Sequence, residues 1–419
     1  MMNTRSLLCS LSLALLFNPV FAQSNHLIGT YGNVYKNYDF PEISDTPAPE
    51  GYKPFYISHI SRHGSRYPVS SNYVRNGLDI MLKGDSMGIL TPDGRRLLRA
   101  YRALDSVSIG MYGMLCELGI DEHKRLGERM AKRFSVVFAD AKRKKVNSAS
   151  TDAPRAIVSG TNFCAALAAN TPKMDISFIA GPKYADLLHN ENQPWLRKNN
   201  HQGGLYSDAY MEKHFPYDSF YGRLFTDTQK IYAILETKRL LAESTFANGT
   251  VADYLGLPEM LGLMKPEEYK EAAIAYTNKM FYSHCNSKKA GHIRIHLMDE
   301  LLKDFISKAD AAINDDSDVA ADLRFSHDTA LMPFFSLIGL KGFEKKVDFD
   351  DAYKVWDATH LMCMAANLQM VFYKDSRNDV LVKFLHNEQE TDLPLLRPFS
   401  APYYKWQDVR EYFLNRLKQ

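Results

Sequence analysis

Hydrophobic and polar positions follow two different periods along this chain, and together they predict strands separated by helices. Runs rich in aromatic and β-branched residues predict buried or half-buried strands. They cover residues 54–60, 146–150, 174–179, 323–325, 366–373 and 380–385. Apolar residues at helical spacing predict helices over residues 71–82, from residue 92, from about 120 to 137, and over 156–168.

The middle of the chain has a different character. Residues 181–312 contain long polar and aromatic stretches with helical periodicity and few β-branched runs. We assign them to an inserted, mostly α-helical lobe, with residues 23–180 and 313–419 forming the core. Residues 23–52 carry Gly, Pro and polar residues and are interpreted as an extended arm over the surface.

The first 22 residues are typical of a secretory signal peptide. Arg5 gives a positive start, residues 7–17 are apolar, and residues 20–22 end in a small-residue cleavage pattern. We expect cleavage near Ala22, so that the mature chain begins at Gln23 and is exported to a periplasm or the medium. No later apolar run reaches the ~20 residues that a membrane span requires.

Composition and charge narrow the class of partner. The chain has 419 residues, 45% hydrophobic and 24% charged, which is long enough for a large core and two lobes. The net charge is only +2. A nucleic-acid partner is not expected, because duplex binders carry a strong basic excess or stripe.

Cysteine and histidine spacing predicts no metal centre. Export permits disulfides among Cys116, Cys164, Cys285 and Cys363, but buried free thiols are an equally strong alternative, because three of the four lie in apolar surroundings. No CxxC pair is present. His292 and His296 have metal-ligand spacing on a helix, but without an acidic third ligand a helix-surface pair is favoured.

The most informative stretch follows the predicted strand 54–60 and reads Arg62-His63-Gly64-Ser65-Arg66-Tyr67-Pro68. We interpret it as a phosphate-binding turn that carries a nucleophilic histidine, since two arginines and a helix N-terminus could converge there on one anion. Five fixed residues in seven would match a random chain of this length on the order of once in ten thousand.

Two later segments repeat the same arrangement of a strand end next to a helix. The first, Thr151-Asp152-Ala153-Pro154-Arg155, supplies a further arginine, with Ser159 one helical turn away. The second brings His327-Asp328 to the start of a helix that Thr329 can cap. These segments are the expected partners of the first motif.

The first motif is the RHGxRxP signature of the histidine phosphatases, and the chain resembles branch 2 of that superfamily, which contains acid phosphatases and phytases. The pair His327-Asp328 matches the second signature of that branch. The segment ending in Arg155, together with Asn387-Glu388, looks like the multiple inositol-polyphosphate phosphatase subgroup. That subgroup usually has His-Ala-Glu, whereas this chain has His327-Asp328-Thr329, the acid phosphatase and phytase form.

The resemblance implies a phosphoglycerate-mutase-like α/β fold, with a three-layer core around a mixed sheet and the active site between core and helical lobe. Phosphoryl transfer depends mainly on positioning and fixed positive charge. Arg62, Arg66, Arg155 and His327 could surround the phosphate oxygens. Flanking cations would keep His63 neutral and able to attack phosphorus in line.

Asp328 is the expected proton donor to the leaving alcohol. The charge of a bound ester would raise its pKa, which predicts a mildly acidic working range. In the second half-reaction the ionised Asp328 would take a proton from water as it attacks phosphohistidine. Neither a metal nor another cofactor is expected, because arginines supply the positive charge.

The sequence therefore predicts an exported phosphomonoesterase whose small-molecule substrates are inositol polyphosphates, phytate included. A broad acid phosphatase or a sugar-phosphate phosphatase is the first alternative. A non-catalytic inositol-phosphate binding protein is the second, although pure binding needs no proton donor such as Asp328. A phosphoglycerate-mutase-like transferase fits poorly with an export signal. The oligomeric state is left open.

Overall fold

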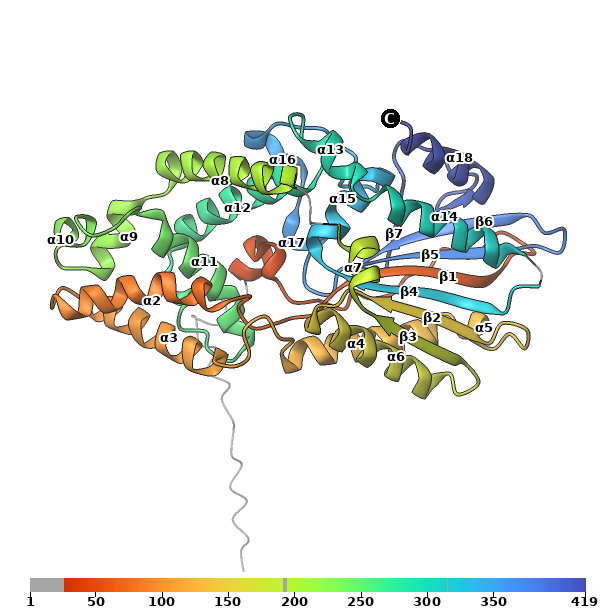
Figure 1. The fold of residues 1–419 in the computed structure, drawn as a ribbon, viewed down its shortest axis with the longest axis horizontal. Coiled ribbons are helices and arrows are strands. Elements are labelled where there is room, and N and C mark those ends of the chain that lie inside the picture. The colour runs from red at the N-terminus through yellow and green to blue at the C-terminus, as the bar shows by residue number, and fades with distance from the viewer. Residues whose placement is uncertain (1–25, 191–193, 315) are drawn as a thin grey trace, which may run out of the picture.

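A mixed β-sheet forms one end of the molecule and a group of helices forms the other in the computed structural model (Figure 1). The structure describes residues 26–190, 194–314 and 316–419. The predicted signal peptide, residues 1–22, and its cleavage site lie outside these residues. No helix among the described residues is both long and apolar enough to cross a bilayer.

The strands run in the order β3, β2, β4, β1, β5, β6 and β7, and β8 pairs with β6. Pairs among β1, β2, β3 and β4 are parallel, whereas those among β1, β5, β6, β7 and β8 are antiparallel. The predicted strands are confirmed, and the sheet is mixed as expected. Their bounds are β1 Lys53–Arg62, β2 Lys145–Ser150, β3 Asp175–Ala180, β4 Val319–Ser326, β5 Asn367–Lys374, β6 Val380–His386, β7 Gln389–Thr391 and β8 Tyr403–Lys405.

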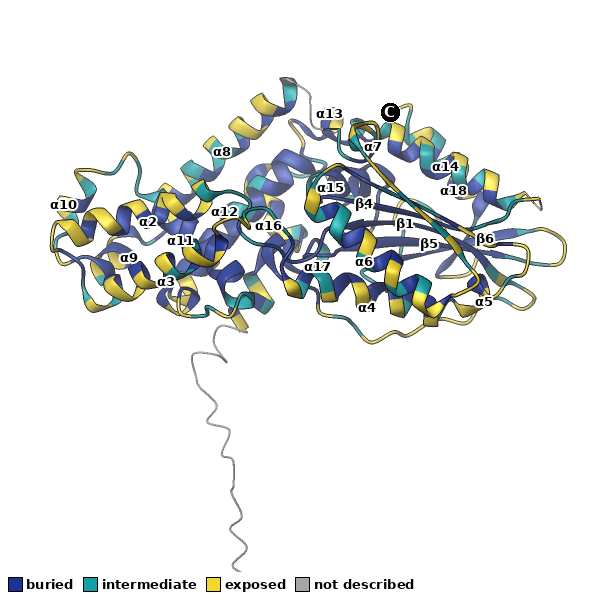
Figure 2. Ribbon diagram, turned by 60° about the horizontal axis from the view of Figure 1, so that its bottom comes forward, coloured by how far each residue is buried: buried dark blue, intermediate teal, exposed yellow. Residues whose placement is uncertain are grey.

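Helices cover both faces of this sheet, which completes the three-layer core (Figure 1). On one face lie α4 Glu117–Arg133, α5 Ser135–Phe138 and α6 Pro154–Asn170; on the other lie α7 Pro182–Leu188, α14 Asp299–Ile313, α15 Asp328–Ile338 and α18 Trp406–Arg416. Figure 2 shows the consequence, with strands buried and exposed residues on the outer sides of the helices. The edge strand β3 is the most exposed of the longer strands.

The helical lobe contains further helices and short turns, all from the described part of the chain. They are α2 Ser71–Ser86, α3 Pro92–Ser108, α8 Pro194–His214, α9 Tyr217–Leu224, α10 Thr228–Tyr232, α11 Arg239–Tyr254, η2 Leu261–Leu263 and α12 Pro266–His284. Between lobe and sheet lie η1 Asn33–Tyr35, α13 Gly291–His296, η3 Phe349–Asp351, α16 Ala352–Val355 and α17 Ala358–Leu361.

The lobe differs from the inserted segment 181–312 predicted from the sequence. Helices α2 and α3 precede that segment, yet they pack against α11 and α9. Helices α7 and α14 fall inside it, yet they pack on β2 and β4. Apolar periodicity identifies a helix but not the surface on which the helix packs. The helices of the observed lobe therefore do not coincide with the segment predicted from composition.

Local sequence signals explain where the helices next to the motifs begin. The Thr91 hydroxyl accepts a hydrogen bond from the backbone N–H of Gly94, at 3.0 Å, and caps α3. Pro154 occupies the first turn of α6, where its missing N–H costs nothing. The predicted cap of α15 was wrong: His327, not Thr329, precedes the first helical residue, so Asp328 opens the helix.

The N-terminal arm was only partly predicted. Residues 26–31 are helical, and η1 is buried rather than spread over the surface. Its residues are apolar or aromatic except Asn33, whose side chain donates to Thr277 Oγ1 at 2.5 Å. The interpretation as an extended surface arm holds only for the part that follows, residues 37–52.

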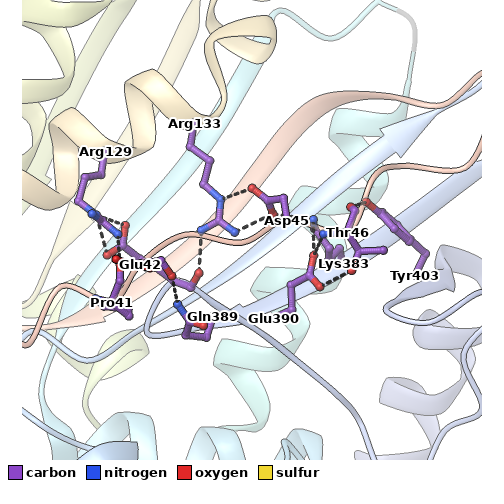
Figure 3. A network of polar contacts seen from close by, with 11 residues as sticks. Pro41, Glu42, Asp45, Thr46, Arg129, Arg133, Lys383, Gln389, Glu390 and Tyr403 are labelled. Carbon is purple, nitrogen blue, oxygen red and sulfur yellow. Dashed lines mark hydrogen bonds and ion pairs between the residues drawn. The ribbon is translucent and has the colours of Figure 1, made fainter.

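A balanced set of charges fastens that extended part to α4 and to the strands β6 and β7 (Figure 3). We call it the arm clamp. Its basic members are Arg129, which pairs with Glu388 at 2.8 Å, Arg133, which pairs with Asp45 at 2.7 Å, and Lys383, which pairs with Asp45 at 2.8 Å and Glu390 at 2.9 Å.

The arm clamp also satisfies backbone groups of the arm. Arg129 donates to the Pro41 carbonyl at 2.7 Å, and Gln389 donates to the Glu42 carbonyl at 2.7 Å. Tyr403 donates its hydroxyl to the Thr46 carbonyl at 2.7 Å. The arm therefore has fixed partners along its length, even though it lacks regular secondary structure.

Candidate active site

The parallel register of β1, β4 and β2 brings the three sequence motifs to one edge of the sheet. Arg62 at the end of β1 pairs with Ser326 at the end of β4, and Ser150 at the end of β2 pairs with Phe325. The residues that follow these strand ends therefore lie together at this edge, as expected for carboxyl ends of parallel strands. His63 and His327 meet there, with ring centroids 5.4 Å apart.

His63 is held as a neutral imidazole with one nitrogen available. Its Nδ1 lies 2.9 Å from the carbonyl oxygen of Gly64. Because a carbonyl only accepts, Nδ1 carries the proton and Nε2 keeps its lone pair. Burial, followed by the positive charges of Arg62 and Arg155, holds the pKa of His63 well below its usual value of 6.5.

Arg62 is fully buried and bracketed by distant parts of the chain. Its Nη1 donates to the carbonyls of Val34, at 2.6 Å, and Met362, at 2.8 Å. Its Nη2 lies 2.8 Å from Oδ2 of Asp328. The Nε atom has no hydrogen-bond partner among the described residues. The guanidinium is thus fixed in orientation and retains capacity to bind an anion.

Arg66 and Arg155 approach the same point from the first motif and from α6. The backbone carbonyl of Arg66 accepts a hydrogen bond from Tyr254 at 2.7 Å, which ties the turn to the lobe. Arg155 Nη2 lies 3.4 Å from His327 Nδ1. Since a guanidinium only donates, His327 Nδ1 accepts, and its Nε2 then donates to Thr151 Oγ1 at 3.0 Å.

Asp328 opens α15 with its side chain 15% exposed. One carboxyl oxygen accepts from the backbone N–H of Thr329, at 3.0 Å, and the other faces Arg62. Burial raises the pKa of Asp328, but the charges of Arg62 and Arg66 outweigh it and leave that pKa below its usual value of 3.8. The carboxyl is therefore ionised over the neutral range before an anion binds.

All six residues predicted from the sequence come together at this edge: Arg62, His63, Arg66, Arg155, His327 and Asp328. They give three guanidinium groups and one carboxylate around a single available imidazole nitrogen. Such an arrangement suits an anionic ester whose central atom is attacked by nitrogen and whose alcohol is the leaving group. Within residues 26–190, 194–314 and 316–419, no cluster of three or more His, Cys, Asp or Glu side chains could hold a metal ion.

A buried carboxylate that supports the first motif was not predicted from the sequence. Glu122 of α4 is fully buried and accepts hydrogen bonds from Ser65 N at 2.7 Å, Ser65 Oγ at 2.8 Å and Tyr38 N at 2.9 Å. It thereby fixes the turn to both α4 and the arm. Ser159, which the sequence placed one helical turn after Arg155, accepts from the backbone N–H of Gly64 at 3.1 Å.

Two glycines allow the motif turn to touch the start of α4. A Cβ atom on Gly64 would lie 2.6 Å from the carbonyl oxygen of Gly119, and one on Gly119 would lie 2.1 Å from that of Ser65. Both distances are too short for real side chains. The glycines therefore permit the close approach that brings Glu122 under the turn.

A second group of side chains packs around the start of α15. The His189 ring lies 4.4 Å from that of His327, and His189 Nε2 is 2.6 Å from Thr329 Oγ1. Arg294 of α13 contacts both the Thr329 carbonyl and His284. The cysteines take no part in this site: Cys116, Cys164, Cys285 and Cys363 are buried free thiols.

Comparisons with known proteins bear on the family and the fold of this chain. A sequence model of the histidine phosphatase superfamily, branch 2, matches residues 56–204 and 266–387. No curated protein matches the sequence. Among solved structures, the chain is similar to a multiple inositol polyphosphate phosphatase from Bifidobacterium longum crystallised with inositol hexasulfate. The TM-score is 0.74 at 19% identity, over 91% of this chain and 96% of that one.

Two phytases are also similar in fold. The phytase from D. castellii gives a TM-score of 0.68 at 15% identity, over 94% of this chain and 85% of that one. The phytase from Citrobacter braakii gives a TM-score of 0.55 at 12% identity, over 87% and 98%. At these identities the likeness concerns the fold, which is the one that the sequence predicted.

Proposed function

Because the chain belongs to branch 2 of the histidine phosphatase superfamily and is a phosphatase, we propose that it hydrolyses inositol polyphosphates, phytate included, through a phosphohistidine formed on His63. The observation that carries this proposal is the state of His63. Its Nδ1 proton is committed to the Gly64 carbonyl, and its Nε2 lone pair is available among three arginines.

In the first step His63 Nε2 attacks phosphorus. A nitrogen–phosphorus bond forms while the ester oxygen–phosphorus bond breaks, and the electron pair of that bond leaves with the alcohol oxygen. Arg62, Arg66 and Arg155 hold the phosphate oxygens in line for this displacement. Each nearby guanidinium contributes ~4 kcal/mol of Coulomb attraction at an effective dielectric near 20, before desolvation is subtracted.

Asp328 supplies the proton to the leaving oxygen. In the ligand-free protein its carboxylate is paired with Arg62, so it cannot donate. A bound ester adds negative charge beside it and competes for Arg62, and both effects raise the pKa of Asp328. The protonated carboxyl then donates to the alcohol oxygen as the ester bond breaks.

The second step releases phosphate. Water attacks phosphorus opposite His63 Nε2, Asp328 takes a proton from that water, and the nitrogen–phosphorus bond breaks. The electron pair of the broken bond returns to Nε2, so the products are inorganic phosphate and neutral His63. Asp328 gives its proton to solvent as phosphate leaves and pairs with Arg62 again, which restores the starting state. Arginine supplies the positive charge in both steps.

The choice of inositol polyphosphates follows from the relatives. One similar structure is an inositol polyphosphate phosphatase held with inositol hexasulfate, and two others are phytases. The pair His327-Asp328 agrees with the acid phosphatase and phytase form of the second motif. We further propose that the protein is exported after cleavage near Ala22, which N-terminal sequencing of the mature protein would test.

The decisive experiment combines trapping with product analysis. Rapid acid-free quenching of a reaction with labelled phytate should leave label on His63, identified by peptide mapping. Ion-exchange chromatography should then reveal lower inositol phosphates and phosphate accumulating together. Label on another residue would reject the mechanism, and hydrolysis of small esters with phytate untouched would instead support the acid or sugar-phosphate phosphatase alternative.

A further inference from the structure

Among the described residues, Arg62 and Arg294 are the two arginines that are 0% exposed, and both contact the segment that carries the expected proton donor. Arg62 pairs with the Asp328 carboxylate itself, at 2.8 Å. Arg294, from α13, donates through Nη2 to the backbone carbonyl of Thr329, the next residue in α15. Burying a guanidinium costs free energy, so the contacts that it makes must offset that cost. The proposed reaction uses Arg62 but not Arg294.

Thr329 is held from two directions at the start of α15. Its carbonyl accepts from Arg294, and its hydroxyl lies 2.6 Å from Nε2 of His189, the residue that follows α7. Its backbone N–H donates to Oδ1 of Asp328 at 3.0 Å. The N–H that orients the Asp328 carboxyl therefore belongs to a residue that two other elements of the fold keep in place.

A proline in α15 makes the Thr329 carbonyl available to Arg294. In a regular α-helix this carbonyl would accept from the N–H of residue 333, four positions later. Residue 333 is a proline inside the helix, and it has no N–H to donate. Arg294 supplies a donor in its place. The first turn of α15 therefore takes one of its hydrogen bonds from a neighbouring helix, and the direction of that turn depends on this bond.

Arg294 is itself fixed, because α13 packs against α15 and contacts the end of α12. A Cβ atom on Gly291, the first residue of α13, would lie 2.6 Å from the backbone carbonyl carbon of Asn286, so glycine permits the close approach that places this helix. His284, the last residue of α12, lies with Nδ1 2.9 Å from Arg294 Nη2. Since a guanidinium only donates, His284 Nδ1 accepts this bond. Arg294 therefore joins the end of α12 to the start of α15.

Two contacts orient the Asp328 carboxyl, the guanidinium of Arg62 and the N–H of Thr329. In the proposed reaction a bound ester competes for Arg62, and the proton must then reach the leaving oxygen at a set distance and angle. The Thr329 N–H remains to direct the carboxyl.

We infer that Arg294 is a positioning residue for the proton donor. Through the Thr329 carbonyl it holds the Asp328 carboxyl toward the leaving oxygen after Arg62 has engaged the phosphate. This inference rests on the proposed function and goes beyond it, because it assigns a part in the reaction to a side chain for which no contact with the substrate is proposed.

The test measures the first step alone, in a single turnover with enzyme in excess, on two substrates that differ in their need for a proton. Arg294→Met should lower the rate for phytate about 10- to 100-fold, because a misplacement of ~1 Å costs up to about 10²-fold. The rate for p-nitrophenyl phosphate should change less than about twofold, because nitrophenolate leaves without a proton. The Kd of inorganic phosphate, measured by calorimetry, should stay unchanged, since Arg62, Arg66 and Arg155 remain.

Two further variants test the route through the Thr329 carbonyl. Pro333→Ala, added to Arg294→Met, gives this carbonyl a helical donor and should recover part of the rate on phytate, whereas no recovery would overturn the route. If Arg294→Met does not fold, Arg294→Lys is measured in its place. Lysine cannot reproduce the planar fork of the guanidinium, so the ratio of the phytate rate to the p-nitrophenyl phosphate rate should still fall. An unchanged ratio would overturn the inference.

The matched control removes another buried arginine. Arg324 of β4 is 3% exposed and pairs with Asp304 at 2.7 Å. Arg324→Met should leave the ratio of the two rates unchanged, even if it lowers stability. A ratio that falls equally with Arg324→Met and with Arg294→Met would overturn the inference, because loss of any buried arginine would then explain the effect.

The outcomes separate this inference from the proposed function. If the wild-type protein hydrolyses neither phytate nor p-nitrophenyl phosphate, the proposed function fails. If phytate alone is left intact, a simple alkyl phosphate takes its place in the comparison, since its alcohol also needs a proton. If the wild-type protein hydrolyses both substrates and Arg294→Met slows them equally or not at all, the positioning role is overturned while phosphatase activity stands.

Discussion

Two clusters of basic side chains in this molecule differ in how many carboxylates balance their positive charge. In the arm clamp, Arg129, Arg133 and Lys383 face three carboxylates, and every positive charge has a negative partner within 3 Å (Figure 3). At the active site, the charges of Arg62 and Arg66 both act on one carboxylate, that of Asp328, which forms its ion pair with Arg62.

The difference lies in what completes each cluster. The arm clamp is neutral within itself, so it holds chain to chain and leaves nothing for a ligand. The active site has surplus positive charge, partly desolvated and kept in place by backbone carbonyls, so its missing partner is an anion from solution. Matched charges hold the arm to the core, whereas the surplus positive charge lies at the proposed phosphate site.

The largest expected effect on kcat comes from removing the proposed nucleophile at the active site. His63→Ala should lower kcat by at least about 10⁴-fold, because it removes the nitrogen proposed to attack phosphorus. The measurement is release of phosphate from phytate. Calorimetry should still detect phosphate binding to the variant, since the arginines remain. Undiminished turnover would show that another group attacks phosphorus.

The next effect tests the single carboxylate of that cluster. Asp328→Asn should lower kcat about 10²–10⁴-fold for inositol phosphates, whose alcohols need a proton, and much less for p-nitrophenyl phosphate, whose leaving group does not. Equal losses on both substrates would mean that Asp328 orients Arg62 rather than donating a proton.

The pH dependence of kcat provides a further test of Asp328. Its direction follows from the pKa shifts of His63 and Asp328. The pKa of His63 lies well below 6.5, so its imidazole stays neutral and nucleophilic until the pH is low. Asp328 must be protonated in the complex, so wild-type kcat should fall as pH rises through the raised pKa of Asp328 in that complex. The Asn variant has no such group, and its profile should lack this alkaline fall.

Breaking the arm clamp should change stability and leave chemistry alone. Lys383 is 1% exposed between Asp45 and Glu390. Lys383→Met removes a charge partner from both, so the free energy of unfolding should fall by about 1–3 kcal/mol at neutral pH. Chemical denaturation measures it, with Lys341→Met as the exposed control, where no measurable change is expected. A large drop in kcat would contradict the division between the clusters.

That loss should disappear in acid. Burial raises the pKa of both carboxyls, but other groups outweigh it and hold the pKa of Asp45 below its usual value of 3.8 and that of Glu390 below 4.5. For Asp45 these groups are Arg133 and Lys383, and for Glu390 they are Lys383 and Thr46. Groups with lowered folded pKa values stabilise the fold above the unfolded values and lose that contribution as pH falls through the folded values. The difference between wild type and Lys383→Met should therefore shrink below about pH 4.

A further effect on stability, of similar size, is expected when phosphate binds at the active site. Inorganic phosphate at a hundred times its Kd should stabilise the wild-type protein by about 2.7 kcal/mol. Lys383→Met should gain the same increment, since its active site is intact. Arg66→Met should gain less, because one of the three guanidinium groups is gone. Equal stabilisation of both variants would mean that phosphate binds elsewhere.

Most of this architecture could be predicted from the sequence, because the candidate site residues lie in short motifs at strand ends. Arg62 and His63 share one turn, and His327 and Asp328 share another, so local pattern was enough to predict their neighbourhood. The strands followed from their apolar runs, and parallel pairing of β1 with β4 then brought the motifs together.

The parts that sequence did not predict depend on contacts without a local signature. Glu122 is a single carboxylate in a helix, and such a residue is usually exposed to solvent. The carbonyls of Val34 and Met362 belong to the backbone, so no residue type marks them. The lobe boundary was misjudged because α2 and α3 look the same in sequence whether they cover the sheet or the lobe.

The groups that hold the Arg62 guanidinium come from distant parts of the chain, and this affects when the site can form during synthesis. One carbonyl that holds it comes from residue 34 and the other from residue 362, and its carboxylate partner comes from residue 328. A growing chain cannot orient this guanidinium fully until residue 362 has been made. Products that stop before residue 362 therefore lack an assembled phosphate site, and the site forms only when this late segment packs against the segment around residue 34.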